Sequence, residues 1–222
     1  MAVLLTWLVL ASDMTAGAAE PGKGEASASN EALRKELIQM EKVDQAARSA
    51  MMKALGEQGI SFAGGKPITD LKALAVLAEE TRKLGKVDAA HRVRLKAIVE
   101  KHGWPGKSLV GSDGAHAAWL LVQHADADRK FQAQCLRLME AAAPGEVAGK
   151  DIAYLTDRVL VGERKPQRYG TQLGADFKPL PIEDEKQVDV RRAALGLPPL
   201  AEYVKTTKAE YEKLAGKGAD KK

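Results

Sequence analysis

The sequence contains few of the residues on which common catalytic and binding sites depend. Cys135 is the only cysteine among 222 residues, so no disulfide can form within the chain. Cys135 lies at helical spacing from apolar residues, which favours a buried thiol over a nucleophile. The sequence lacks a glycine-rich phosphate loop, a His-Glu-x-x-His motif, a Gly-x-Ser-x-Gly motif and a zinc-binding cysteine cluster. We therefore predict neither a bound metal ion nor a cofactor.

Basic charge is too thinly spread to predict a nucleic-acid partner. The 34 Lys and Arg residues against 30 Asp and Glu residues give a net charge of +4, and Lys217, Lys221 and Lys222 supply much of that surplus. A nucleic-acid surface needs a clustered basic stripe with stacking aromatic residues. The chain has no such stripe, and aromatic residues make up only 5% of it.

The first residues differ from the rest of the chain. Residues 2–11 are apolar except for Thr6, and the small residues Ala16-Gly17-Ala18-Ala19 follow, a pattern typical of a cleavable signal peptide over residues 1–19. The run is shorter than the roughly 20 apolar residues that cross a bilayer. We therefore expect export to the periplasm or the medium, and no permanent membrane anchor. No Lys or Arg precedes the run, so a hydrophobic N-terminal arm or a misassigned start codon is the alternative.

The remaining composition is that of one soluble globular domain. Hydrophobic residues make up 45% of the chain and charged residues 29%. Residues 20–29 are rich in small and charged residues and predict a flexible linker. We expect residues 30–214 to form the domain and residues 215–222 to form a disordered basic tail.

Helical spacing dominates the predicted domain, in which apolar residues recur every three or four positions. We therefore predict a mainly α-helical, single-domain bundle. Pro67 is expected to open a second helix that stops at Gly85, and Asp88 to cap a third that ends at Gly103. The other predicted helices span about residues 30–55, 112–126, 131–139, 152–159, 188–195 and 200–214, with Ser112 or Asp113 as the cap of the fourth.

The helical spacing is lost near residues 165–182. Residues 169–171 and 178–182 could pair as a small β-hairpin, since Gly174 offers a turn between them. An irregular insert that caps the helical core is the alternative.

Asp44 interrupts the apolar stripe of the first helix. At about 100° per residue it falls in the middle of that stripe, and Arg48 lies one turn further along. A buried carboxylate is costly unless it is paired. Asp44 is therefore either a catalytic acid positioned by a ligand-binding Arg48 or half of an ion pair at the edge of the core.

The end of the fourth helix carries the best acid–base candidate, His124, because imidazole titrates near neutrality. We expect Asp126 to orient it as a second catalytic residue. Gln123 lies one turn beyond Trp119 and is expected to point inward, where its amide needs partners such as Gln132. Both glutamines are ligand-binding candidates. The alternative is a structural histidine at a helix end.

Asp157 and Arg158 are adjacent on the sixth helix. Neighbouring helical residues diverge by about 100°, so we expect at most one of them to point into a pocket. Asp157 is the catalytic candidate, and a surface ion pair is the alternative.

The run from Gln167 to Gln172 is the most unusual in the sequence. Its hydrogen-bonding side chains, with Gly170 allowing close backbone approach, suit recognition of a polar ligand. Gln167, Tyr169 and Gln172 are the binding candidates there. Structural capping of the helices is an equally good interpretation.

Arg191 and Arg192 place two positive charges in the seventh predicted helix. Arg191 is a candidate to bind a carboxylate or phosphate. An ion pair with Asp184 or Asp189 is the more ordinary role.

Several motifs occur in one fixed order: Gly-Trp-Pro at 103–105, Trp-Leu-Leu-Val-Gln-His-Ala-Asp at 119–126, Ala-Tyr-Leu-Thr-Asp-Arg-Val at 153–159 and Gln-x-Tyr-Gly-Thr-Gln at 167–172. Together they resemble a widespread bacterial family of unknown function, domain of unknown function 6624. The resemblance spans residues 88–203, and residues 40–48 separately resemble the first helix of that family. It implies a shared fold and carries no known activity.

Two functions remain open at this point. The first is an enzyme or binding protein for a small polar or anionic molecule, with a metal-independent hydrolase or lyase that uses His124 as acid or base as the enzyme class. The second is a non-catalytic module of the cell envelope that binds another protein. An open site with unsatisfied polar groups favours the first, and mutually satisfied buried groups favour the second.

Overall fold

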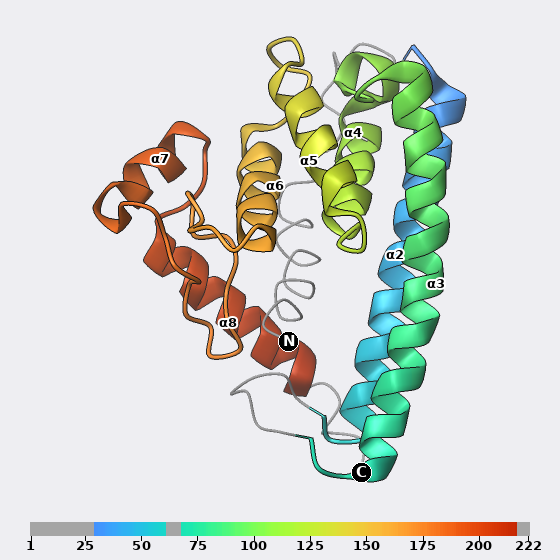
Figure 1. The fold of residues 1–222 in the computed structure, drawn as a ribbon, viewed down its shortest axis with the longest axis vertical. Helices are drawn as coiled ribbons and strands as arrows, with labels where there is room; N and C mark the ends of the chain where they lie inside the picture. The colour runs from blue at the N-terminus through green and yellow to red at the C-terminus, as the bar shows by residue number, and fades with distance from the viewer. Residues whose placement is uncertain (1–28, 61–67, 217–222) are drawn as a thin grey trace.

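The computed structural model describes residues 29–60 and 68–216, which are mostly helical (Figure 1). Within that part of the chain seven α-helices form and no β-strand does. The predicted mainly α-helical, single-domain bundle is therefore confirmed. The predicted signal peptide, linker and basic tail lie almost entirely outside the described residues.

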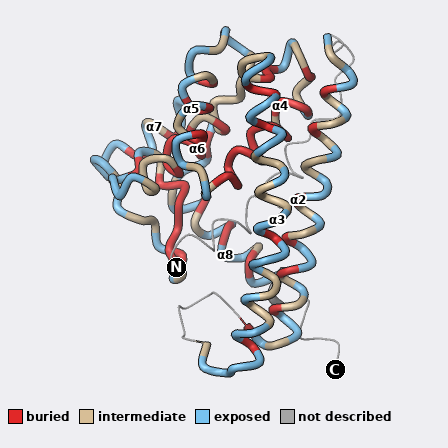
Figure 2. The backbone as a smooth tube through the Cα atoms, turned by 45° about the vertical axis from the view of Figure 1, so that its right-hand side comes forward, coloured by how far each residue is buried: buried red, intermediate tan, exposed pale blue. Residues whose placement is uncertain are grey.

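Helices α2 (Glu31–Glu57) and α3 (Leu71–His102) form a long antiparallel hairpin along one side of the molecule (Figure 1). Each helix begins at a side-chain N-cap, Asn30 for α2 and Asp70 for α3. Buried residues recur along the facing sides of both helices, which is why the two stripes pack together (Figure 2).

The predicted division of α3 into two helices is wrong. The helix begins at Leu71 and continues through Gly85 and Asp88 to its C-cap at Gly103, where φ is 70°. A glycine costs a helix interior only about 1 kcal/mol relative to alanine, and packing against α2 outweighs that cost. Pro67 lies outside the described residues.

Helix α4 (Lys107–Gln123) is the buried centre of the molecule (Figure 2). Gly111, at φ 71° and ψ 170°, interrupts its helical geometry. Regular turns therefore resume beside the predicted cap at Ser112 or Asp113. All side chains of residues 117–125 are buried.

Helices α5 (Arg129–Glu140) and α6 (Gly149–Gly162) complete the main core. The chain runs down α2, α4 and α6 in one direction and along α3 and α5 in the other (Figure 1). Within the described residues these five helices supply most of the larger of two apolar clusters, which includes Leu37, Trp119 and Leu155.

The segment after α6 is the irregular insert and not a regular hairpin. Its only described β-contacts are two isolated bridges, Gln167 with Ile182 and Leu173 with Pro179. Proline has no backbone N–H to donate to a strand ladder. Pro179 and Pro181 therefore limit the pairing to these separate points.

Three further elements follow the insert: the 3-10 turn η2 (Glu185–Gln187), helix α7 (Val188–Ala194) and helix α8 (Leu200–Gly216). The predicted stop at Gly196 is confirmed, since α7 ends before this residue, whose φ is 71°. Among the described helices, none is both long and apolar enough to span a membrane.

A second, smaller apolar cluster lies in the far half of the α2–α3 hairpin and contains Met51, Leu55 and Leu84. The larger cluster begins on the same two helices with Leu37 and Leu95. The residues between the two clusters are polar, and they form the candidate site.

Candidate functional site

A layer of charged side chains crosses the hairpin between the two apolar clusters. Asp44 is fully buried on α2, and Arg48, one turn later, is 6% exposed. Arg48 Nε donates to Asp44 Oδ2 and Arg48 Nη2 to Asp44 Oδ1, both at 3.0 Å. The two residues therefore form the expected ion pair, and they form it well inside the molecule.

His124 reaches this ion pair from the end of α4. Its Nδ1 lies 2.9 Å from Asp44 Oδ2 and 3.0 Å from Arg48 Nε. With a proton on Nδ1 the ring donates to Asp44, and without one it accepts from Arg48. Asp44 and Arg48 thus fix the orientation of an imidazole that is 3% exposed.

Asp88 joins from α3, because Arg48 Nη2 also donates to Asp88 Oδ1 at 2.7 Å. Its side chain is 13% exposed. Asp88 was not among the predicted site residues, because its sequence context is that of an N-cap. On an unbroken α3, Asp88 falls on the apolar side between Leu84 and Leu95, which is the same signal that identified Asp44. We call Asp44, Arg48, Asp88 and His124 together the charge cluster.

Burial and neighbouring charges shift the pKa values of this cluster in different directions. Burial, reinforced by Arg48, lowers the pKa of His124 to about 4. Burial raises the pKa of Asp88 to about 6, even though Arg48 opposes it. Burial also favours a raised pKa for Asp44, but His124 and Arg48 outweigh it and hold that pKa below its ordinary value. At neutral pH the His124 imidazole is therefore neutral, and the Asp88 carboxyl group has a pKa close to neutrality.

Asp126 does not orient His124 as expected. Its carboxylate accepts from Arg158 Nε at 2.9 Å and makes a second, shorter contact with Arg158 Nη2. Gln132 Nε2 donates to Asp126 Oδ1 at 3.1 Å and to the carbonyl oxygen of Val122 at 3.1 Å. Asp126 lies two residues after His124, beyond the end of α4, and its side chain points away from the ring. The partners of Asp126 are Gln132 on α5 and Arg158 on α6.

Asp157 and Arg158 are both buried, which corrects the expectation that at most one points inward. Both are covered because α6 is enclosed on two sides. Arg158 turns toward Asp126. The Asp157 carboxylate accepts, at 2.7 to 3.2 Å, from the backbone N–H groups of Arg168, Tyr169 and Thr171 and from the Thr171 hydroxyl.

This geometry makes Asp157 the anchor of the insert. Burial raises the pKa of Asp157, while the four donors oppose that rise. Gln167 holds the insert in a similar way, since its amide donates to the carbonyl oxygens of Gln172 and Leu180 and accepts from the Gln172 N–H. These groups are mutually satisfied, as in a structural network.

The other two candidates beyond α6 also lie away from the charge cluster. Tyr169 is half-buried in the insert. Arg191 donates to the backbone carbonyl oxygens of Arg168, Glu183 and Asp184. Gln172 links the insert to the Arg158–Asp126 pair, since its Oε1 accepts from Arg158 Nη1 at 3.4 Å.

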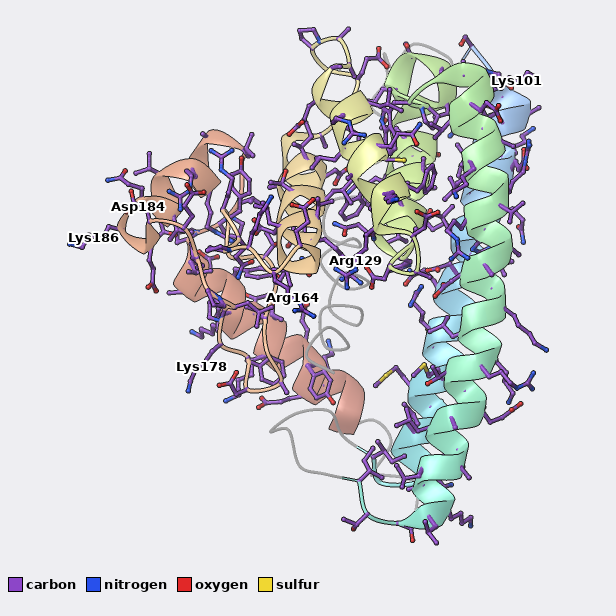
Figure 3. All side chains as sticks on the ribbon, viewed as in Figure 1. Lys101, Arg129, Arg164, Lys178, Asp184 and Lys186 are labelled. Carbon is purple, nitrogen blue, oxygen red and sulfur yellow. The ribbon has the colours of Figure 1, made fainter. Side chains whose placement is uncertain are left out.

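The end of α4, the start of α5 and the end of α6 meet at one end of the helix group, where Figure 3 also shows Arg129 and Arg164. Arg129 covers Gly162 so closely that an added Cβ there would collide with the Arg129 guanidinium. Within the described residues, no three or more His, Cys, Asp or Glu side chains are grouped so that they could hold a metal ion.

Gln123 differs from all of these residues. Its side chain is completely buried, and neither amide atom has a hydrogen-bond partner among the described residues. A buried polar group without a partner calls for an explanation such as a ligand or water.

The family model for a family of unknown function, DUF6624, matches residues 31–215. The chain belongs to this family. No curated protein and no solved structure matches the chain. The matched span of this DUF6624 member begins in α2 and ends in α8, and so contains the charge cluster, Gln123 and the anchored insert.

Proposed function

We propose that this DUF6624 member binds a small polar molecule and transforms it by acid–base chemistry at the charge cluster. The observation that carries the proposal is the contact of Arg48 with both His124 and Asp88, two titratable groups whose pKa values are displaced in opposite directions. Such pairs of displaced groups occur at catalytic sites more often than elsewhere.

The energetic cost of the cluster supports a functional role. Buried ion pairs are often no more stabilising than apolar side chains of similar volume, because both charges lose their hydration. The hairpin already has apolar clusters on either side, and leucines in this layer could join them. Charged residues at this position therefore favour a role beyond packing.

The geometry suggests a division of labour. Asp88 is the proton-transfer group, because its pKa of about 6 lies nearest to neutrality and its side chain is partly exposed. Neutral His124 serves as a hydrogen-bonding partner for the reacting group, with Asp44 as its positioning residue. Hydrolysis and elimination suit these groups, because in both reactions a base removes a proton from water or from the bound molecule and an acid protonates the leaving group.

The alternative is a non-catalytic module of the cell envelope. It is favoured by the insert, where Asp157 accepts from the Thr171 hydroxyl and Gln167 pairs with the backbone of Gln172, contacts that hold the structure together. Under this alternative the charge cluster would be a structural layer as well.

Ligand screening followed by product analysis separates the two functions. The purified chain is screened by thermal shift against amino acids, short peptides, sugars and nucleosides, and stabilising compounds are incubated with it and examined by mass spectrometry. We expect at least one compound to be converted, and Asp88→Asn and His124→Gln to reduce conversion at least 100-fold.

Asp176→Asn is the matched control, because this aspartate lies on the surface of the insert. Its conversion rate should equal that of the parent. Circular dichroism checks that each variant is folded. Conversion that survives in both cluster variants, or a panel from which nothing is converted, would refute catalysis at the cluster.

A further inference from the structure

A pocket opens on the surface where the end of α6 meets the insert, and we call it the α6 pocket. None of its lining residues belongs to the charge cluster. Its volume is about 250 Å³, and a cavity of roughly 150 Å³ is enough to hold benzene. The α6 pocket therefore has room for a small molecule. The lining residues are Val161, Arg164, Lys165 and Pro166 on one side and Leu180 and Pro181 on the other.

The walls of the α6 pocket are mostly apolar, and buried hydrogen bonds fix them. The backbone N–H of Gln167 donates to the carbonyl oxygen of Pro181 at 2.9 Å, and its side-chain amide donates to that of Leu180 at 2.8 Å. Gln167 itself is fully buried. The rings of Pro166 and Pro181 restrict the backbone further. The pocket is therefore preformed, which lowers the entropic cost of binding a ligand.

The turn after α6 holds Arg164 in a backbone conformation that is unusual for its residue type. The C-cap of α6 is Glu163, and Arg164 follows it with φ 61°. The Arg164 N–H donates to the carbonyl oxygen of Val161, and the Lys165 N–H donates to that of Leu160, which is the pattern of a Schellman motif. Glycine usually occupies this left-handed position, because a side chain is strained there. An arginine at such a position favours a role for its side chain.

Arg164 brings a positive charge to the α6 pocket that no described residue neutralises. Its exposed guanidinium forms no ion pair or hydrogen bond within the described part of the chain, whereas Lys165 Nζ pairs with Glu163 at 2.7 Å. The carbonyl groups at the end of a helix carry partial negative charge. Arg129, whose guanidinium covers Gly162, offsets that charge from the neighbouring helix (Figure 3). The end of α6 is therefore compatible with a bound anion.

We propose that the α6 pocket binds a small carboxylate with an apolar body, such as an aryl-substituted or branched alkyl acid. The apolar body lies against Val161, Leu180 and the two prolines. The carboxylate accepts from the Arg164 guanidinium, whose planar fork matches two carboxylate oxygens. This site is separate from the charge cluster, so the inference goes beyond the proposed acid–base function.

Two other classes of anion fit the α6 pocket less well. A phosphate monoester carries nearly two charges and three strong acceptor oxygens, whereas the pocket's described lining offers it a single unpaired guanidinium. A long acyl chain is too large, since pockets for larger ligands measure about 300 to 1,000 Å³.

An NMR titration of the nitrogen-15-labelled protein with 3-phenylpropionate tests the proposal. We expect saturable shifts of the backbone signals of Val161, Arg164 and Leu180, with a Kd of about 1 mM or tighter, as suits a ligand of this size. The uncharged 3-phenylpropionamide should bind at least about 5-fold more weakly, because it lacks the charge that Arg164 recognises.

Arg164→Gly separates recognition of the carboxylate from a structural role of the turn. This variant should bind the acid and the amide equally well, because the guanidinium is gone. Its Tm should nevertheless rise by a few degrees, since glycine relieves the left-handed residue. An arginine with only a structural role would leave the preference for the acid over the amide unchanged.

Two further variants complete the experiment. Asp184→Gly is the matched control, because Asp184 also has a left-handed φ, of 43°, and does not line the pocket. It should keep the parent's affinity and its preference for the acid. Val161→Phe fills the pocket from its α6 wall and should abolish the binding of both compounds, while circular dichroism shows an unchanged helical content.

Three results would overturn the proposal: no saturable shifts in the parent, shifts confined to residues outside the α6 pocket, or a preference for the acid that survives in Arg164→Gly. The same measurements keep this inference apart from the proposed function. If 3-phenylpropionate binds and no compound is converted, catalysis at the charge cluster fails and the α6 pocket stands. If a compound is converted and 3-phenylpropionate does not bind, the α6 pocket fails and the catalytic proposal stands.

Discussion

Arg48 is the residue on which the candidate site converges. Its guanidinium joins Asp44 on its own helix, Asp88 on the neighbouring helix and His124 at the end of a third. A planar group with five donors can bind all three partners at once, whereas a lysine ammonium could not form the same fork.

Removal of that guanidinium should be costly. In Arg48→Met, Asp44 and Asp88 would remain buried without their positive partner, and loss of one member of a buried ion pair costs about 3 to 5 kcal/mol. Urea unfolding measures the change. Arg94→Met removes an exposed pair with Glu36 and should cost less than about 1 kcal/mol. Equal costs for the two variants would show that the cluster is not a buried unit.

Asp88 should give the stability of the protein a distinctive pH dependence. Its pKa rises from 3.8 in the unfolded chain to about 6 in the folded protein, chiefly through burial. A raised pKa means that this group's stabilising contribution is complete below about pH 4 and is lost as the pH rises through 6. The free energy of unfolding of the parent should therefore fall relative to that of Asp88→Asn across this window.

Urea unfolding of both proteins between pH 4 and 7 measures that difference. His124 has the opposite linkage, since its lowered pKa reduces stability as the pH falls below its ordinary value. Both proteins retain His124, so the comparison isolates Asp88. A difference that is constant with pH, or that changes in the opposite direction, would contradict the raised pKa.

Individual side chains were predictable from the sequence where a local pattern identified them. Asp44 and Arg48 stood out because a charge interrupted an apolar stripe, and the structure buries both. The partner of His124 was not predictable, because Asp126 is near it in sequence whereas Asp44 approaches it from another helix. Tertiary contacts of this kind leave no periodic signal.

Among the elements, α3 shows the limit of local signals most clearly. Gly85 has the sequence character of a helix stop, yet the helix runs through it. The insert shows the same limit. Gly174 suggested the turn of a hairpin, whereas the anchorage of the insert to Asp157 depends on its folding back against α6. The other helices were predicted because their apolar spacing extends over several turns.

Gly85 offers a direct test of helix continuity. Its position is helical and exposed, and an added Cβ would meet no atom within 4 Å. Gly85→Ala should therefore stabilise the protein by about 1 kcal/mol and raise Tm by a few degrees. A thermal melt measures the shift.

Gly111 is the matched control. Its φ is 71°, and an added Cβ would lie 3.1 Å from Asp113 Oδ1 and 3.3 Å from Arg34 Nε. Gly111→Ala should lower Tm, because a side chain is strained in that conformation. A lower Tm for Gly85→Ala would instead indicate that α3 is broken at this position.

For the molecule as a whole, the proposal of export rests on the first nineteen residues. Their pattern predicts a signal peptide, and they lie outside the described part of the structure. We expect the chain, expressed with a C-terminal tag in a bacterium, to be recovered outside the cytoplasm. Mass spectrometry of the intact protein should then show a mature form that begins close to residue 20. A full-length cytoplasmic product would contradict export.

The polar layer between the two apolar clusters also limits how the long hairpin can assemble. Two helices joined only by smooth apolar stripes can slide past each other by one turn at little cost. In this hairpin a slip that moved Arg48 from Asp88 toward Leu84 would bury the guanidinium against apolar side chains without its acidic partner. The charges therefore favour a single alignment of α2 with α3.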